Sequence, residues 1–193
     1  MAATTLWFWG GTALVPGQPK GIIEDAAVGI TAGKITYVGK RLAASPAPGD
    51  RKLDSTGCLV LPGLVNGHAH TGMSLLRGIA DDLPLESWLR EHIFPLERKW
   101  VSPEFTYWGT LLASAEMIRS GTTAFNDMYF FQDSSARAST EAGLRMVAGQ
   151  TLVEESDVDK TGVDPIKNFE RFLEAVADFP LVTPRIAPHA VYS

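Results

Sequence analysis

The sequence predicts an α/β fold in which a parallel sheet covered by helices follows a small all-β module. Three observations predict this fold. Residues 5–39 are short apolar runs separated by glycine-containing turns, as in antiparallel sheets. After His70 the apolar period changes from two residues to about 3.6, the period of a helix. Strand and helix patterns then alternate with connections of crossover length, which is typical of β-α-β units.

The N-terminal module is expected to contain four short strands. Leu6–Trp9 and Ala13–Val15 each end at a pair of turn-forming residues. Ala27–Thr31 and Lys34–Val38 flank a two-residue turn that contains a glycine, which indicates a tight hairpin. Residues 40–52 hold prolines, alanines and charges, and are predicted to form a loop.

A pair of histidines ends the next apolar run, and the rest of the chain is organised around it. Residues 58–65 are apolar and lead into His68 and His70. Residues i and i+2 of a strand point to the same face, so the two imidazoles should project together from the carboxyl end of the strand. Two such imidazoles can form half of the ligand shell of zinc or a similar divalent ion. An H-x-H pair can also be two solvated loop residues, but the strand before it favours the metal site.

Helical patterns begin after this pair. The first starts near Pro84, and Pro95 should end or kink it. The second starts at Ser102 and Pro103, an N-cap and first-turn pair, and should end before Gly121. Apolar residues at helical spacing predict one face of each helix, in the first Leu85, Trp88, Leu89, Ile93 and Leu96, and in the second Phe105, Trp108, Leu112 and Ala115.

The remaining elements continue the alternation as far as His189. Their predicted ranges are 122–128 (strand), 133–142 (polar helix before Gly143), 144–153 (strand), a helix opened by Asp164-Pro165 with Phe169, Phe172, Leu173 and Val176 on one face, and 182–188 (strand). Four parallel strands with crossover helices are half of a (β/α)8 barrel.

The stretch LPGLVNGHAHTGMSLLRGIADDLPLESWL, residues 61–89, resembles the first barrel strand and following loop of the amidohydrolase superfamily. The closest likeness is to the branch that holds 5-methylthioadenosine/S-adenosylhomocysteine deaminases and triazine chlorohydrolases. The resemblance runs over nearly the whole chain. It implies that residues 1–60 form the N-terminal part of a composite β-sandwich. Residues 61–193 are then the first four βα units of a TIM-like barrel, which is incomplete here.

The sequence ends directly after the fourth predicted strand, so we expect it to be the N-terminal portion of a longer protein, by design, truncation or proteolysis. The alternative is a complete domain with an open four-stranded sheet. A half-barrel would leave sheet edges unpaired, and we therefore expect a homo-oligomer, with dimerisation through the open edge.

Composition excludes several classes of function. The formal charge is −5, from 17 basic and 22 acidic residues that are dispersed along the chain, which argues against a nucleic-acid surface. No stretch approaches the roughly 20 apolar residues of a membrane span, and the N-terminus lacks a signal-peptide pattern, so a cytoplasmic protein is expected. Cys58 stands alone, which suits a reducing compartment. It lies in an apolar run and is predicted to be a core residue rather than a nucleophile.

The resemblance implies one zinc, or another divalent metal such as iron, per subunit of the complete enzyme, with His68 and His70 among its ligands. Another histidine and an aspartate that complete the site are expected after Ser193, as are the glutamate and histidine that transfer protons. No catalytic residue is therefore expected within this chain, which alone should be inactive and should bind metal weakly. The metal would activate water for attack on the ring carbon that carries an exocyclic amine.

Two residues are expected to bind substrate on the strength of the resemblance. Glu97 matches a glutamate that holds ribose hydroxyls, and a carboxylate accepts such hydrogen bonds well. The alternative for Glu97 is a solvated charge at a helix end. His189 matches a histidine that contacts substrate rather than metal, and its alternative is a structural role.

Three further residues are candidates for the pocket. Trp88 could wall the pocket, although an aromatic at helical spacing is more often a core residue. Met73, just past His70, is also a candidate for the pocket because of its loop position. Gln150 stands where some S-adenosylhomocysteine deaminases carry an arginine that suits a carboxylate. Gln150 thus favours smaller, uncharged thioether nucleosides. Asp127 is expected to orient neighbouring groups rather than to react.

The leading hypothesis is a metal-dependent hydrolase that deaminates an adenine nucleoside: 5′-methylthioadenosine, adenosine or S-adenosylhomocysteine. The same metal chemistry would serve a chlorohydrolase or aminohydrolase of another nitrogen ring, such as a triazine or guanine. A third possibility is a catalytically inactive half-barrel that serves as a binding module. Substrate contacts, rather than the metal ligands, must distinguish the first two.

Overall fold

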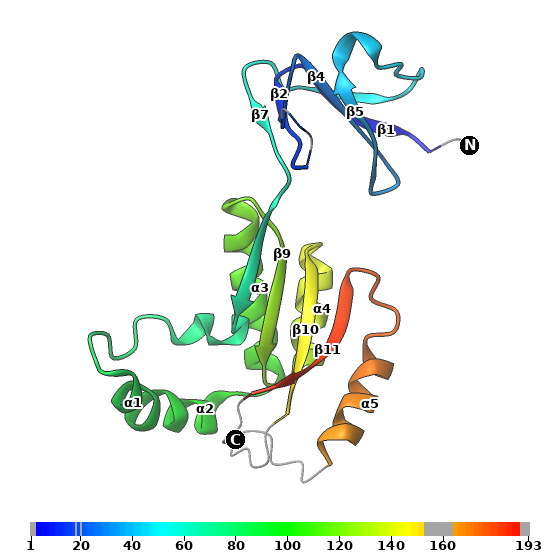
Figure 1. Cartoon of the computed structure of the whole chain (residues 1–193). Coiled ribbons are helices and arrows are strands. Elements are labelled where there is room, and N and C mark those ends of the chain that lie inside the picture. Colours follow the sequence, from blue (N-terminus) through cyan, green and yellow to red (C-terminus); the bar gives the residue numbers. More distant parts are fainter. Residues whose placement is uncertain (1–2, 18, 20, 153–163, 190–193) are drawn as a thin grey trace. The chain divides into compact units, whose positions relative to one another are not determined.

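The computed structural model describes residues 3–17, 19, 21–152 and 164–189. The chain divides into two compact units, Met1–Pro62 and Gly63–Ser193, each with sheets of its own (Figure 1). No helix in the described ranges has the length and apolar composition needed to cross a membrane.

The first unit contains two small β-sheets, so the prediction of a β-module is confirmed. Its described residues form seven strands rather than the four predicted, and β6 begins within the predicted loop 40–52. One has the order β5-β4-β1-β6 and the other β3-β2-β7. Their bounds are β1 Thr5–Trp9, β2 Thr12–Leu14, β3 Ile22–Glu24, β4 Ala26–Thr31, β5 Lys34–Lys40, β6 Arg51–Asp54 and β7 Leu59–Val60.

Both sheets contribute to one small core, in which Ala13, Ala26 and Val28 are buried. The predicted hairpin is confirmed: β4 and β5 pair antiparallel, and Ala32 and Gly33 between them both have positive φ. This backbone matches the twist of the strands that it joins.

The prediction that Cys58 is a core residue is wrong, because its side chain is exposed. The apolar run does not form a single buried strand. Cys58 lies in the turn before β7, and its N–H donates to the carbonyl oxygen of Ser55 at 2.9 Å. The apolar side chains of Leu59 and Leu61 after it are also exposed.

The second unit is built on a four-stranded sheet with the order β11-β10-β9-β8. All three strand pairs are parallel, so the predicted alternation of strands and crossover helices is confirmed. The strands are β8 Leu64–Ala69, β9 Thr122–Tyr129, β10 Arg145–Leu152 and β11 Val182–Pro188, and the crossover helices are α3 Pro103–Arg119, α4 Gln132–Ala142 and α5 Pro165–Ala175.

The predicted helix ends at Ser102, Gly143 and Asp164 are also confirmed. The Ser102 hydroxyl accepts a hydrogen bond from Phe105 N–H at 3.1 Å, and Asp164 accepts one from Ile166 N–H at 2.8 Å. Gly143 ends α4 in the left-handed conformation, where glycine has no steric penalty.

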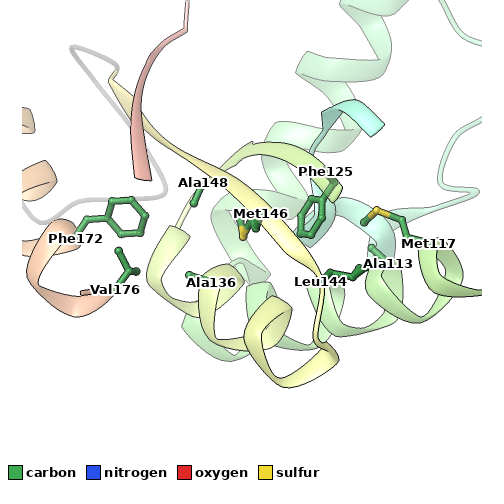
Figure 2. Packing of buried hydrophobic residues seen from close by; sticks show 9 residues of the cluster. All are labelled: Ala113, Met117, Phe125, Ala136, Leu144, Met146, Ala148, Phe172 and Val176. Carbon is green, nitrogen blue, oxygen red and sulfur yellow. The ribbon is translucent and has the colours of Figure 1, made fainter. Parts of the chain in front are cut away.

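The core of this unit lies between the sheet and its helices. Phe125 of β9 and Met146 of β10 are each 1% exposed and belong to one apolar cluster with side chains of α3, α4 and α5 (Figure 2). The buried residues of this apolar cluster are Ala113, Met117, Phe125, Ala136, Leu144, Met146, Ala148, Phe172 and Val176. Other apolar strand residues are exposed, among them Val65 (71%).

The predicted apolar face of α3 is not its buried face. Trp108 is 53% exposed and Leu112 is 42% exposed. The buried face instead carries mostly small residues, half of them polar, which are Thr106, Gly109, Thr110, Ala113, Ser114 and Met117. Small side chains allow α3 to approach α4 and the 3-10 turn η2 (Thr71–Leu76) closely, and this packing overrides the apolar pattern.

Pro95 does not end its helix, which continues to Trp100. The helix begins as α1 (Leu85–Ser87), widens into the π-helical η3 (Trp88–Ile93) and tightens again in α2 (Phe94–Trp100). Pro95 therefore stands in the first turn of α2, where an α-helix does not need a backbone N–H.

The backbones of η2 and α3 lie close together at Gly109. A Cβ atom there would lie 2.4 Å from the carbonyl oxygen of Gly72. An alanine normally stabilises a helix interior by about 1 kcal/mol relative to glycine. For Gly109→Ala we instead expect a net loss of about 2 kcal/mol in the free energy of unfolding, measured by urea denaturation. Gly67→Ala adds a methyl group into open space and is the control. Equal stability of the two variants would contradict the close contact.

Candidate metal and substrate site at the strand ends

The two histidines lie together at the carboxyl end of β8. The Nε2 atoms of His68 and His70 are 3.1 Å apart, and their rings are nearly perpendicular. The β8–β9 pairing shifts register between Asn66 and Ala69, so His68 lies in an irregular part of the strand. Such irregularities commonly redirect side chains at functional edges of a sheet. His68 is exposed and His70 is half-buried.

His70 has a fixed orientation. Its Nδ1–H donates to the carbonyl oxygen of Met128 at 2.6 Å, because a carbonyl can only accept. This bond leaves the lone pair of Nε2 available as a ligand. Two imidazole nitrogens that share one tetrahedral zinc ion, each about 2.0–2.1 Å from it, are roughly 3.3 Å apart. The observed pair therefore fits a shared divalent metal.

Among the described residues, His68 and His70 are the candidate metal ligands that the structure brings together. Over residues 3–17, 19, 21–152 and 164–189, no cluster of three or more His, Cys, Asp or Glu side chains has the geometry of a metal site. Catalytic zinc sites usually have about three protein ligands. His68 and His70 thus account for part of such a ligand set.

The turn after His70 is held by a buried carboxylate. Asp127 is 0% exposed, and its two oxygens accept hydrogen bonds from the Thr71 N–H at 2.6 Å and the Gln132 side-chain amide at 2.9 Å. Burial raises the pKa of the Asp127 carboxyl, although these hydrogen bonds oppose the shift. The contacts agree with the expectation that Asp127 orients its neighbours.

Glu97 is buried, with 6% of its surface exposed, so the interpretation of it as a solvated helix-end charge is wrong. The Tyr129 hydroxyl donates to its Oε1 at 2.8 Å. Burial raises the pKa of the Glu97 carboxyl, while Tyr129 and the nearby His70 lower it. Burial and the neighbouring Glu97 also raise the pKa of the Tyr129 phenol, which keeps it a neutral donor.

Gln150 and His189 lie at the ends of the other two strands. Gln150 of β10 is half-buried and stands beside Tyr129 of β9 in the sheet register. His189 follows β11, and its backbone N–H donates to the carbonyl oxygen of Leu152 at 3.3 Å. Parallel strands are about 4.8 Å apart, so three strand spacings along the sheet separate His189 from the histidine pair.

Met73 and Trp88 lie on the connection between β8 and α3, where they line one cavity of about 460 Å³ with residues 74 and 76–83. The Trp88 indole N–H donates to the carbonyl oxygen of Ile79 at 3.1 Å, which ties the helix to this loop. His70 lines a different hollow, between β8 and α3. The two hollows share Ser74 and Arg77 in their linings, so Met73 and Trp88 lie together in a cavity next to the one that His70 lines.

Sequence reasoning missed Tyr129 and Gln132. Tyr129 ends the second barrel strand and Gln132 opens the helix after it, so their position at the carboxyl edge of the sheet was available as a signal. Their partners, Glu97 and Asp127, could not be paired with them from the sequence, because the contacts link separate elements.

A family model described as the amidohydrolase family matches residues 59–193. This chain belongs to the amidohydrolase family. The match covers the histidine pair and all four strands of the parallel sheet.

Similar proteins are named as deaminases. A 5-methylthioadenosine/S-adenosylhomocysteine deaminase of Syntrophobacter fumaroxidans is 47% identical over 176 residues, which are 88% of this chain and 39% of that protein. A 5′-deoxyadenosine deaminase of Methanothermobacter thermautotrophicus is 42% identical over 179 residues, 89% of this chain and 41% of that protein. This amidohydrolase chain spans about two-fifths of the length of such relatives.

The fold of this amidohydrolase chain also matches that of a zinc-bound adenosine deaminase from Xanthomonas campestris. The TM-score is 0.82 and the sequences are 34% identical. The match covers 100% of this chain and 44% of that one.

The buried Glu97 predicts a pH dependence of stability. A carboxyl whose pKa is higher in the folded protein contributes stability below its unfolded value, 4.5, which is lost as the pH rises through the folded value. In metal-free protein, Glu97→Gln should therefore flatten the fall in the free energy of unfolding as the pH rises above 4.5. Asp127 acts in the same direction, so part of the slope should persist. Urea denaturation across this range is the measurement.

The exposed Glu104→Gln is the matched control for this substitution, since Glu104 lies in the first turn of α3. It should keep the wild-type pH profile. A Glu97→Gln profile as steep as that of Glu104→Gln would show that burial of Glu97 does not couple protonation to folding.

Proposed function

We propose that this chain supplies two metal ligands and part of the substrate pocket of an aminohydrolase that deaminates adenine nucleosides. The observation that carries the proposal is the His68–His70 pair, with Nε2 atoms 3.1 Å apart and one ring fixed by the Met128 carbonyl. The identity to proteins named as deaminases supports the reaction class.

The metal in this proposal is zinc, or another divalent ion such as iron, with one ion per subunit. When bound, such an ion lowers the pKa of a coordinated water and supplies hydroxide near neutral pH. His68 and His70 would hold it. We propose that the other ligands and the proton-transfer residues come from strands beyond these four. The chain by itself would then have no complete catalytic site.

Glu97 is proposed to accept hydrogen bonds from the sugar hydroxyls of the substrate. The Tyr129 hydroxyl occupies Oε1, which leaves Oε2 for a ligand. A carboxylate is acceptor-only when ionised and can take two hydroxyl donors. The burial of Glu97 supports this role, because hydrogen bonds to a desolvated carboxylate discriminate strongly against a ligand that lacks the hydroxyls.

The remaining pocket residues are proposed to select an uncharged nucleoside. Gln150, beside Tyr129, can hydrogen-bond but cannot pair with a carboxylate as an arginine would. This favours 5′-methylthioadenosine or adenosine over S-adenosylhomocysteine. His189 is proposed to bind or polarise the substrate, and Met73 and Trp88 to wall the purine from the β8–α3 loop.

The arrangement of the chain in the complete enzyme is part of the same proposal. Residues 1–60 would form the N-terminal part of a composite sandwich, and residues 61–193 the first four βα units of the barrel. We also propose a homo-oligomer. Exposed apolar side chains on the strands, such as Val65 and Ile186, support burial of this sheet against further polypeptide.

The activity test is release of ammonia from 5′-methylthioadenosine and adenosine by the complete gene product. We expect turnover of both, loss of activity after chelation and recovery on addition of zinc. S-adenosylhomocysteine should be a poorer substrate by kcat/KM. Activity on a chlorinated triazine alone would replace the proposal with the chlorohydrolase alternative, and no hydrolysis of any ring would favour the binding module.

Zinc affinity should depend directly on the histidine pair. His68→Ala removes one of the two converging nitrogens, so zinc affinity should fall by about tenfold or more, since even outer-shell changes can cost that much. Competition with a chromophoric chelator measures it. His92→Ala, a half-buried histidine of η3, is the control and should bind zinc as the wild type does. Equal zinc affinity of the two variants would remove the metal site from the proposal.

A further inference from the structure

One buried acid at the strand ends has no part in the proposed chemistry. Asp127 accepts one hydrogen bond on each carboxylate oxygen, from Thr71 N–H and from the Gln132 amide. A buried carboxylate is costly unless it is well hydrogen-bonded. In the described part of the chain, no Lys or Arg forms an ion pair with it. Amide donors therefore hold this carboxylate.

Both residues of the Thr71–Asp127 hydrogen bond are close to His70, one along the chain and one through Met128. Thr71 directly follows His70 in the chain, and Asp127 directly precedes Met128, whose carbonyl accepts the His70 Nδ1–H at 2.6 Å. One hydrogen bond thus fixes the ring of His70 and the adjacent one fixes the backbone after it. Together they determine both the position and the rotation of the imidazole.

The rest of the turn has little freedom to shift. The Thr71 hydroxyl lies 2.9 Å from that of Thr110, which is 3.1 Å from that of Ser135. Gly72 packs against the Tyr129 ring, where an added Cβ would lie 2.5 Å from a ring carbon. These contacts hold the turn in one position. The Asp127 carboxylate connects the turn to the end of β9, and the same strand end orients His70 through Met128.

We propose that Asp127, oriented by Gln132, is a positioning residue that sets His70 for metal binding. The inference rests on the proposed metal-dependent function and deepens it. Asp127 acts through the backbone of Thr71 rather than on the metal. Outer partners of metal-ligating histidines typically contribute about 10- to 100-fold in metal affinity.

Two substitutions separate position from charge. Asp127→Ala removes the acceptor for Thr71 N–H. Asp127→Asn removes the charge but keeps an oxygen for that bond. Its new amide can donate to Gln132 after the Gln132 side chain turns over, because Gln132 Oε1 is buried and has no partner in the described structure. Positioning by hydrogen bonds predicts that asparagine rescues what alanine loses.

The experiment has two readouts on the full chain. Zinc affinity is measured by chelator competition, and the tautomer of His70 is read from imidazole ¹⁵N shifts in the metal-free protein. For Asp127→Ala we expect a loss of about 10- to 100-fold in zinc affinity, together with loss of the Nδ1–H tautomer. For Asp127→Asn we expect the wild-type tautomer and affinity within about threefold of wild type. Asp133→Ala, an exposed acid of α4, should match the wild type.

A folded Asp127→Ala protein with wild-type affinity and tautomer would overturn the inference. Equal losses in the alanine and asparagine variants would also overturn it, because charge rather than position would then be responsible. If Asp127→Ala does not fold, Gln132→Met tests the same arrangement. We expect its zinc affinity to fall by about three- to tenfold, and unchanged behaviour in both readouts would contradict the inference.

Failure of the proposed function is a distinct result. A wild-type chain that shows the Nδ1–H tautomer of His70 but no zinc binding would contradict the metal site. The tautomer comparison between the Asp127 variants would still decide whether Asp127 positions His70.

Discussion

The pairing of β8 with β9 is the constraint on which the candidate site depends. Parallel register places the end of β8, with its two histidines, beside Asp127 and Met128 of β9. The His70–Met128 and Thr71–Asp127 hydrogen bonds join these two strand ends across about 60 residues of sequence. Without that register the His70 ring would lose the Met128 carbonyl that fixes its direction.

A layer of small polar side chains supports this register from behind. The buried face of α3 contacts η2 and α4 through groups such as Thr110, Ser135 and the backbone of Gly109. Hydroxyl groups in that layer need hydrogen-bond partners once they are buried. The linked hydroxyls of Thr71, Thr110 and Ser135 meet this need, and such a chain specifies one arrangement more strictly than an apolar layer would. The buried hydroxyls of Thr106 and Ser114 have no partner in the described part of the chain.

Two buried carboxylates give the strand ends their electrostatic character. Burial raises the pKa values of Glu97 and Asp127. Hydrogen bonds that favour the charged carboxylate oppose both shifts. His70 lies close enough to lower the pKa of each carboxyl. A cation beside His70 would be attracted by the same charges. These charges support the proposed divalent ion on the histidine pair and the proposed hydroxyl-bearing ligand on Glu97.

The sequence alone determined the order of strands and helices in the second unit, the helix caps and the position of the histidine pair. These are local properties, set by apolar period, cap chemistry and the spacing of two residues on one strand. Only the tertiary structure decided that Cys58 is exposed, that the small polar face of α3 is the buried one, and that Glu97 is buried against Tyr129. Each of these depends on which distant element covers a residue, and local patterns carry no information about that.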